Sequence, residues 1–251
     1  MPFHIQNLKM KKQTPGKSFV FLCLILFSGL IFESCTKQMM IDIPNDQPED
    51  NQFTYLALGD SYTIGESVAY PERWPVQLRT YLLNQEVDMQ EPRIIAKTGW
   101  TTDELKAGIQ TADHDPTYDL VSLLIGVNNQ YRGRTAEQFR PEFAELLRTS
   151  IGFAGGNPTR VFVVSIPDWG ATPFANNRDK AKIAKEIDQF NAVCKQEADK
   201  AGVRYFDITA ISRKAPQDPA LIASDGLHPS GKMYAEWVQL IGPEIKKLLK
   251  P

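Results

Sequence analysis

The sequence predicts an α/β fold in which helices cover a parallel sheet. Five short apolar runs alternate with longer segments of helical periodicity from residue 53 to the C-terminal end. Two of these runs, at residues 119–125 and 160–165, are almost entirely apolar, as central parallel strands buried on both faces should be. Strands that alternate with helices form parallel sheets with right-handed crossovers, so we expect a five-stranded α/β sandwich.

The five strands are predicted from composition and length. The first contains aromatic and β-branched side chains, which favour an extended backbone. The third and fourth are the two almost unbroken apolar runs, and the second is the shortest. In chain order the predicted strands are residues 53–58, 93–96, 119–125, 160–165 and 203–208.

The segments between the strands carry apolar side chains every three or four residues, which is the spacing of one face of a helix. In the longest segment this face contains Ile183, Ile187, Phe190 and Cys194. Helices are predicted at residues 73–86, from Thr101 or Thr102 through Ile109, at residues 135–151 and 176–201, and from Ser230 to the C-terminal end.

Residues 1–34 have the features of a signal peptide and are not expected to belong to the folded domain. Positive side chains precede a fourteen-residue apolar run at residues 19–32, which is shorter than the roughly 20 residues that a membrane-spanning helix needs. Cys35 follows where a bacterial lipoprotein is cleaved and lipidated. The segment resembles a loose lipobox, with Phe32 and Glu33 in place of the usual small or aliphatic residues. We therefore expect an exported cell-envelope protein anchored to the membrane by lipid on Cys35; a plain signal peptide and an uncleaved anchor are the alternatives.

Residues 35–52 are polar and acidic and contain Pro44 and Pro48, which predicts a flexible tether. Residues 53–251 suit one compact domain. The chain has 28 basic and 30 acidic residues, and the first 34 residues contain four lysines and one glutamate; this leaves 24 basic and 29 acidic residues, a net charge of −5. No basic stripe stands out, so nucleic acid is not an expected partner. A monomer is expected.

The chain has three cysteines, Cys23, Cys35 and Cys194. Cleavage before Cys35 removes the first, and lipid on Cys35 leaves Cys194 without a partner, so no internal disulfide is expected. Cys194 falls on the apolar face of a predicted helix and is expected to be a buried small hydrophobic residue. No residues occur at metal-ligand spacing, so neither a metal nor a cofactor is predicted.

The first predicted strand runs into Gly59-Asp60-Ser61, which places a hydroxyl at the carboxyl edge of the sheet. Open α/β folds keep their ligand crevice at this edge. Gly59 allows a sharp turn, and the amide groups of a following helical turn would favour negative charge at Ser61. A serine is a weak nucleophile until a base removes its proton. Ser61 is therefore a candidate nucleophile, and a helix N-cap is the ordinary alternative for a serine in this place.

His228 is the candidate base. It lies in Asp225-Gly226-Leu227-His228-Pro229, where Asp225 can hold one ring nitrogen while the other faces Ser61. Pro229 favours an extended backbone at His228, which helps to aim the ring out of the loop. His114 precedes the third predicted strand and is expected at the opposite edge of the sheet. A backbone carbonyl in place of Asp225 is the alternative partner for His228.

Together these blocks resemble the GDSL or SGNH hydrolase family, and the resemblance covers residues 53–249. It implies a flavodoxin-like three-layer sandwich with a five-stranded parallel sheet, and the hydrolysis of carboxylic esters. It also implies that Ser61 is the nucleophile, His228 the base and Asp225 the carboxylate that orients the base.

The resemblance further implies an oxyanion hole made by Ser61, the backbone amide of Gly99 and the side chain of Asn128. The family usually has aspartate after this asparagine, where the present chain has Asn129. Ser61, Gly99 and Asn128 each follow the end of a different predicted strand, so they can converge at one edge of the sheet, as stabilisation of an oxyanion requires. A turn residue is the ordinary alternative for Asn128.

We therefore expect a serine hydrolase that forms an acyl-enzyme on Ser61. A short acyl ester, a lysophospholipid, a thioester and an acetylated sugar all suit this machinery. Nucleotide binding is disfavoured because Gly-x-Gly-x-x-Gly does not follow the first strand. The remaining alternative is a non-catalytic surface lipoprotein that binds a glycan or lipid through aromatic side chains near the expected edge, namely Trp74, Trp100, Tyr131 and Trp169.

Overall fold

The computed structural model of the protein describes residues 52–250. The predicted signal peptide, Cys35 and the predicted tether up to residue 51 lie outside the described residues. Among the described helices, none combines the length and the apolar character that crossing a membrane requires.

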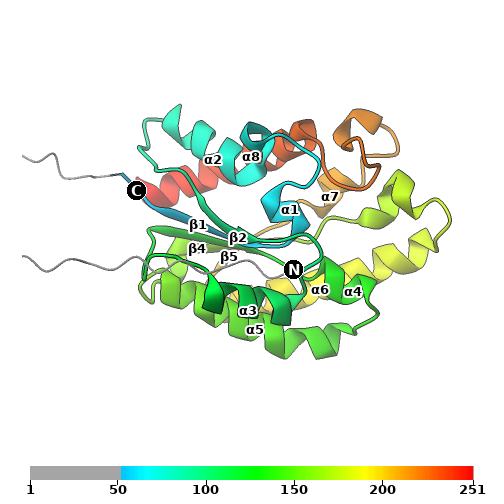
Figure 1. The fold of residues 1–251 in the computed structure, drawn as a ribbon, viewed down its shortest axis with the longest axis horizontal. Helices are drawn as coiled ribbons and strands as arrows, with labels where there is room; N and C mark the ends of the chain where they lie inside the picture. Colours follow the sequence, from blue (N-terminus) through cyan, green and yellow to red (C-terminus); the bar gives the residue numbers. More distant parts are fainter. Residues whose placement is uncertain (1–51, 251) are drawn as a thin grey trace, which may run out of the picture. The chain divides into compact units, whose positions relative to one another are not determined.

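The sheet has five strands in the order β2-β1-β3-β4-β5, and every neighbouring pair is parallel (Figure 1). The strands are β1 (Tyr55–Gly59), β2 (Arg93–Ala96), β3 (Leu120–Leu124), β4 (Val161–Val164) and β5 (Arg204–Phe206). Each overlaps its predicted range, so the predicted five-stranded parallel α/β architecture is confirmed.

Five long helices pack on the sheet: α2 (Trp74–Leu83), α3 (Thr102–Thr111), α5 (Ala136–Phe153), α6 (Lys180–Ala201) and α8 (Gly231–Leu249). Figure 1 shows α2 and α8 above the sheet and α3, α5 and α6 below it. The strand order explains this division. The crossover from β1 to β2 runs in one direction along the sheet and the three later crossovers run in the other. Because all these crossovers are right-handed, those that run in opposite directions along the sheet must lie on opposite faces of it.

The remaining elements are short. They are the helices α1 (Ser61–Ile64), α4 (Val127–Tyr131) and α7 (Thr209–Ser212), and the 3-10 turns η1 (Tyr70–Glu72), η2 (Pro158–Arg160), η3 (Trp169–Ala171), η4 (Pro173–Ala175) and η5 (Pro219–Leu221). Helix α6 begins four residues later than predicted, because Asp179 caps it by accepting a hydrogen bond from the Lys182 amide at 2.9 Å. Residues 127–131, for which no helix was predicted, form α4.

The first and last long helices of the domain pack closely on the same face of the sheet. The Gln77 side chain in α2 donates to the backbone carbonyl of Gly231 at 3.0 Å. At Gly242 in α8, a Cβ atom would lie 2.5 Å from the ring of Tyr81, so only glycine permits this approach. The N-terminal and C-terminal parts of the domain therefore form one joint layer.

Trp74 belongs to the core and not to the edge of the sheet, which corrects its expected position. The side chain is fully buried in α2, and its ring meets Phe162 of β4 edge to face at 6.2 Å between centroids. Tyr55 stacks on the same phenyl ring and shares a hydrogen bond with Ser122 at 2.9 Å. These aromatic contacts fasten α2 to the central strands.

Gly59 lies where β1 turns into α1. A Cβ atom there would lie 2.4 Å from the Leu124 carbonyl oxygen and 2.2 Å from the Thr63 hydroxyl. A side chain at position 59 would therefore force β1 away from β3 or distort α1. The absence of a side chain allows the chain to leave the strand and enter a helix at Ser61 without an intervening loop.

Asp60 caps α1 from a fully buried position. Its Oδ1 accepts a hydrogen bond from the Tyr62 amide at 3.0 Å, whereas its Oδ2 has no hydrogen-bond partner among residues 52–250. Burial raises the pKa of Asp60 to about 7, and the backbone amides of Tyr62, Asp60 and Gly126 offset only part of that effect. The carboxyl group next to Ser61 therefore changes its protonation near neutral pH.

This burial predicts that the domain loses stability as pH rises. The pKa of Asp60 is higher in the folded state than the roughly 3.9 of an unfolded aspartate, so between these values the folded state binds more protons. The free energy of unfolding should fall by up to about 4 kcal/mol between pH 4 and pH 8, and Asp60→Asn should remove most of that slope. Urea unfolding followed by tryptophan fluorescence at several pH values measures it.

Asp88→Asn is the matched control, because it neutralises an exposed carboxylate instead of a buried one. It should leave the pH dependence of the parent unchanged. An Asp60→Asn protein with the same slope as the parent would show that Asp60 does not titrate in this range.

Candidate active site

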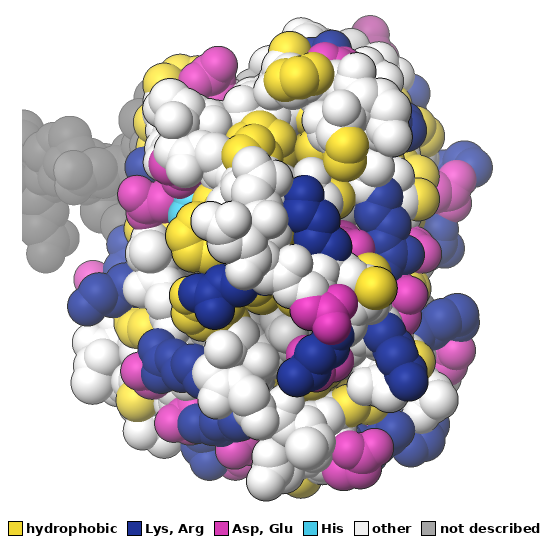
Figure 2. Space-filling model, turned by 90° about the vertical axis from the view of Figure 1, so that its right-hand side faces the viewer, with side chains coloured by type: hydrophobic (Ala, Val, Ile, Leu, Met, Phe, Trp, Pro, Cys, Tyr) yellow, Lys and Arg dark blue, Asp and Glu magenta, His cyan; other side chains and the backbone are white. Residues whose placement is uncertain are grey.

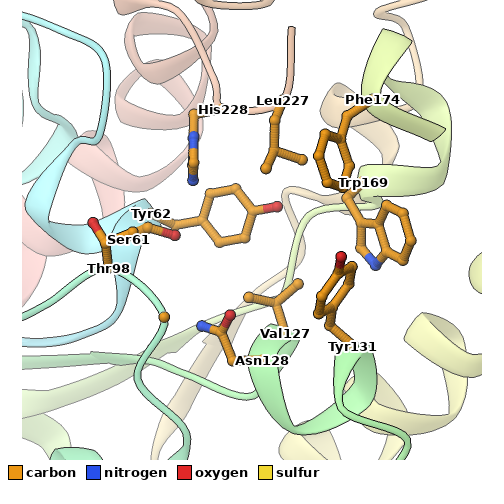
Figure 3. A pocket seen from close by; sticks show the side chains of 11 residues that line it. Ser61, Tyr62, Thr98, Val127, Asn128, Tyr131, Trp169, Phe174, Leu227 and His228 are labelled. Carbon is orange, nitrogen blue, oxygen red and sulfur yellow. The ribbon is translucent and has the colours of Figure 1, made fainter. Parts of the chain in front are cut away.

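A pocket of about 200 Å³ opens at the carboxyl edge of the sheet, where the crossovers change direction. Ser61, Gly99 and Asn128 line it after the ends of β1, β2 and β3, and His228 lines it from the loop before α8. Figure 3 shows the imidazole of His228 and the amide of Asn128 on opposite sides of the pocket, with Ser61 at one end. The four predicted residues are therefore brought together in one place.

Asp225 holds the imidazole of His228 from behind. Its Oδ2 lies 2.5 Å from His228 Nδ1, which leaves the second ring nitrogen for a proton on the pocket side. The other oxygen, Oδ1, accepts hydrogen bonds from the amides of Leu227 at 2.9 Å and His228 at 3.0 Å. The structure thus places a carboxylate, rather than a backbone carbonyl, against the ring of His228.

The carboxylate of Asp225 is well stabilised in its ionised form. Partial burial acts to raise its pKa, but four hydrogen bonds outweigh that effect: the ring and amide of His228, the amide of Leu227 and the hydroxyl of Ser67. The pKa of Asp225 therefore lies well below its usual range. Asp225 remains an anion beside His228 throughout the pH range in which a histidine can act as a base.

Gly99 and Asn128 both line the pocket, where the donors of an oxyanion hole would have to lie. Gly99 has φ = +87°, and the nearest atom to a Cβ there, in the Arg132 guanidinium, would be 3.9 Å away, so the space above it is open. The Asn128 amide donates one hydrogen bond to the Trp100 carbonyl at 3.0 Å. An asparagine amide has two N–H groups, so the second is available for a bound substrate.

Asn129 has a structural role that the sequence did not reveal. It is fully buried, its Oδ1 accepts from the Thr102 amide at 3.1 Å, and its Nδ2 donates to the Thr102 hydroxyl at 2.7 Å. The hydroxyl in turn donates to Glu142. An aspartate at position 129 would place a second carboxylate at this hydroxyl, which has only one proton to give. Asparagine therefore suits this network and holds α4 against the start of α3.

The other end of the pocket is aromatic. Tyr131, Trp169 and Phe174 lie 5.4–6.4 Å apart between ring centroids, and Figure 3 shows them together opposite Ser61. Trp169 is buried and its Nε1 donates to Gln130 at 2.8 Å, whereas Tyr131 and Phe174 are 49% and 46% exposed. Two large rings are therefore held at the pocket mouth with much of their surface uncovered.

The face of the molecule on the right of Figure 1 is drawn in Figure 2. Hydrophobic side chains gather in the upper half of this face, and most Lys, Arg, Asp and Glu side chains lie in the lower half. The pocket is likewise poor in charge, because none of the side chains that line it is a lysine, arginine, aspartate or glutamate.

Trp100 packs over Gly108 of α3 and is absent from the pocket lining, so of the four aromatic candidates only Tyr131 and Trp169 line it. His114 lies in the loop before β3, at the amino edge of the sheet, as predicted, with its ring against Phe153.

Cys194 is buried and free in α6, as predicted, and burial raises the pKa of its thiol. Within residues 52–250 there is no cluster of three or more His, Cys, Asp or Glu side chains suited to a metal ion.

Several pocket residues were missed from the sequence although they adjoin predicted ones. Tyr62 follows Ser61, Thr98 precedes Gly99 and Leu227 precedes His228, so adjacency to a motif was an available signal. The ring of Tyr62 lies against His228 edge to face at 5.7 Å. Phe174 had no such signal, because only the path of the chain after β4 brings it to the pocket.

Comparisons with known proteins agree with this geometry. The GDSL-like Lipase/Acylhydrolase family matches residues 57–236. No curated protein matches the chain.

Similar solved structures include TesA, at 18% identity over 78% of this chain and 99% of TesA, with a TM-score of 0.60. The psychrotrophic esterase EstA from Pseudoalteromonas sp. has 18% identity, covers 80% of this chain and 100% of its own, and has a TM-score of 0.57. The acetylxylan esterase Axe2 from Geobacillus stearothermophilus has 18% identity, covers 79% and 94%, and has a TM-score of 0.55. At these identities the three structures establish a shared fold.

The family match spans well over half of the chain and contains every residue predicted for the site, from Ser61 to His228. The parallel sheet and the pocket at its carboxyl edge agree with that match. The chain therefore belongs to the GDSL-like lipase/acylhydrolase family and is a carboxylic ester hydrolase.

Proposed function

We propose that the protein hydrolyses esters through an acyl-enzyme on Ser61, with His228 as the base and Asp225 as its orienting carboxylate. The observation that carries this proposal is the 2.5 Å contact between Asp225 and His228, on a ring that lines the same pocket as Ser61. A serine beside an oriented imidazole is the arrangement needed for nucleophilic catalysis.

In the first half of the reaction His228 takes the proton of the Ser61 hydroxyl while the oxygen attacks the ester carbonyl. The oxyanion that forms accepts hydrogen bonds from Asn128 and from the amides of Gly99 and Ser61. Collapse of this intermediate breaks the bond to the alcohol, which leaves with the proton held by His228. Water then attacks the acyl-enzyme and gives a proton to His228. As the second tetrahedral intermediate collapses, the bond to Ser61 breaks, His228 returns this proton to the Ser61 oxygen, and the carboxylic acid is released.

The pocket favours an uncharged, apolar acyl group. The aromatic end formed by Tyr131, Trp169 and Phe174 offers exposed ring surface and no charged side chain. Burial of such surface contributes roughly 25 cal/mol per Å² of apolar area. Among the substrates considered from the sequence, this favours simple acyl esters and thioesters and lysophospholipids over acetylated sugars, whose hydroxyl groups need polar partners.

The cellular location is proposed from the sequence of residues 1–35. We infer that lipid on Cys35 anchors the protein to the membrane of the cell envelope after export, with the following acidic segment as a tether. An anchored esterase would meet esters at or near that membrane.

Replacement of the nucleophile tests the mechanism. Ser61→Ala should abolish covalent labelling by a fluorophosphonate and lower ester turnover by about 10⁴-fold or more, with an unchanged unfolding midpoint. Ser224→Ala is the control for labelling, because it removes an exposed hydroxyl that does not line the pocket. Substantial turnover or labelling in purified Ser61→Ala would refute the proposal. A parent protein that neither labels nor turns over any ester would instead favour a binding lipoprotein.

Removal of one exposed ring tests the acyl site. Tyr131→Ala should lower kcat/KM for a p-nitrophenyl ester with a medium-length acyl chain by about 5–10-fold, because roughly 1 kcal/mol of apolar contact is lost. The acetyl ester should change far less. Tyr70→Ala is the matched control, since Tyr70 is equally exposed but lies outside the pocket lining. An equal loss for both esters would contradict an acyl site at the rings.

Lipidation is tested by fractionation of cells that express the full chain. The parent should sediment with membranes and partition into detergent, and Cys35→Ala should lose both properties because the acceptor thiol is gone. Cys194→Ala removes a buried thiol and should behave as the parent does. Parent protein found free outside the cytoplasm would support ordinary secretion.

A further inference from the structure

Ser67 has a backbone conformation that serine rarely adopts. Its φ is +64°, and in residues 52–250 the only other non-glycine residue with positive φ is Glu86. Left-handed backbone at such residues is unfavourable and persists only where the surrounding structure holds it. Strain of this kind gathers at functional sites.

The Ser67 side chain supplies that cause. Its hydroxyl donates to Asp225 Oδ2 at 2.8 Å, the same oxygen that lies 2.5 Å from His228 Nδ1. Ser67 and Asp225 are 158 positions apart in the sequence. The bond therefore joins the loop that follows the nucleophile helix to the loop that carries the base.

The neighbours of Ser67 bind to the other parts of the site. Gly65 ends α1 in a left-handed conformation with φ = +69°, and the Glu66 amide donates to the Ser61 carbonyl at 3.0 Å. The Glu66 carboxylate accepts a hydrogen bond from Thr98, which lines the pocket next to Gly99. Residues 65–67 thus contact the nucleophile helix, the oxyanion loop and the base loop within three positions.

We infer that Ser67 is a positioning residue for the reaction: its hydroxyl fixes the Asp225 carboxylate against His228 and compensates part of the negative charge on the shared oxygen. Both oxygens of Asp225 are then fully engaged. Oδ1 accepts hydrogen bonds from two backbone amides, and Oδ2 lies against the Ser67 hydroxyl and the His228 ring. Without Ser67 the carboxylate would rotate more freely and would stabilise the imidazolium form of His228 more strongly.

The other charged and titratable groups near Asp225 and His228 do not obscure the effect of the Ser67 hydroxyl on His228. Tyr62 and Tyr234 are the buried titratable groups on which Asp225 acts electrostatically, and burial raises the pKa of both, so they stay neutral. Arg73 acts on Tyr234 as a cation, and Asp60 and Asp168 act on Tyr62 as anions. Asp60 titrates near neutral pH, but it does so equally in every Ser67 variant and cancels in a comparison between them.

Three substitutions at Ser67 distinguish the effect of the hydroxyl from the effect of the strained backbone. Ser67→Ala removes the hydroxyl and keeps a side chain in the left-handed conformation, whereas Ser67→Gly removes the hydroxyl and relieves the strain. Ser67→Thr keeps the hydroxyl on a β-branched residue, which tolerates this backbone poorly. Glu86→Gly relieves the same strain at the turn after α2 and serves as the control.

Ser67→Ala and Ser67→Gly should both lower kcat by about 3–10-fold and move the rising limb of the activity–pH profile up by about 0.3–0.5 pH units. The rising limb moves to higher pH for two reasons. Only neutral His228 accepts the Ser61 proton, and an Asp225 carboxylate without the Ser67 hydrogen bond stabilises the protonated form of His228 more strongly. Ser67→Thr should keep the parent profile with a lower unfolding midpoint. Glu86→Gly should keep the profile with an equal or higher midpoint.

The inference rests on the proposed function, so a second readout is independent of catalysis. The titration of the His228 ring, followed by NMR in the parent and in Ser67→Ala, should show the same upward shift, with the His114 signals unchanged. An inactive parent with a shifted His228 titration would refute the esterase proposal and keep the positioning role. Unchanged profiles and titrations in Ser67→Ala, or the same shift in all three Ser67 variants, would overturn it.

Discussion

The site depends on one constraint: β1 and β3 end side by side while the chain after each leaves toward a different face of the sheet. The backbone at Gly59 approaches the Leu124 carbonyl so closely that no side chain fits between them. This contact puts Ser61 at the first position of α1 and leaves Gly126 to begin α4 beside it. Ser61 and Asn128 are thus neighbours because their strands are neighbours, and the loops before α3 and α8 bring Gly99 and His228 to the space between them.

Two aspartates near Ser61 show how the surroundings of a carboxyl group set its pKa. Asp60 is buried, one of its oxygens has no hydrogen-bond partner among residues 52–250, and its pKa is raised to about 7. Asp225 accepts four hydrogen bonds, and its pKa is depressed. The first serves as a cap whose charge is costly, and the second provides a permanent anion beside the imidazole. An aspartate therefore caps the turn at Ser61 in one place, and in the other it lies as an anion beside the His228 ring.

Most of the fold followed from periodicity and strand-end motifs, since every strand and long helix has a local apolar pattern. The limits of the predictions lie where tertiary contacts decide. Residues 127–131 became α4 because Asn129 is clamped to Thr102, a contact between segments 27 positions apart. Trp74 was expected near the edge of the sheet but fills the core, because its helix packs over Phe162. Ser67 carries no motif at all, and only the left-handed backbone and the distance to Asp225 reveal it.

The packing of α2 against α8 determines when, during synthesis and folding, the active site can form. Ser61 leaves the ribosome among the first residues of the domain and His228 among the last, and the helix after His228 must dock on the helix after Ser61. Such non-local pairing is slow to form and cannot begin until the chain is nearly complete. A nascent or truncated chain therefore carries Ser61 without His228 beside it, and the proposed reaction can begin only when the two ends of the domain have met.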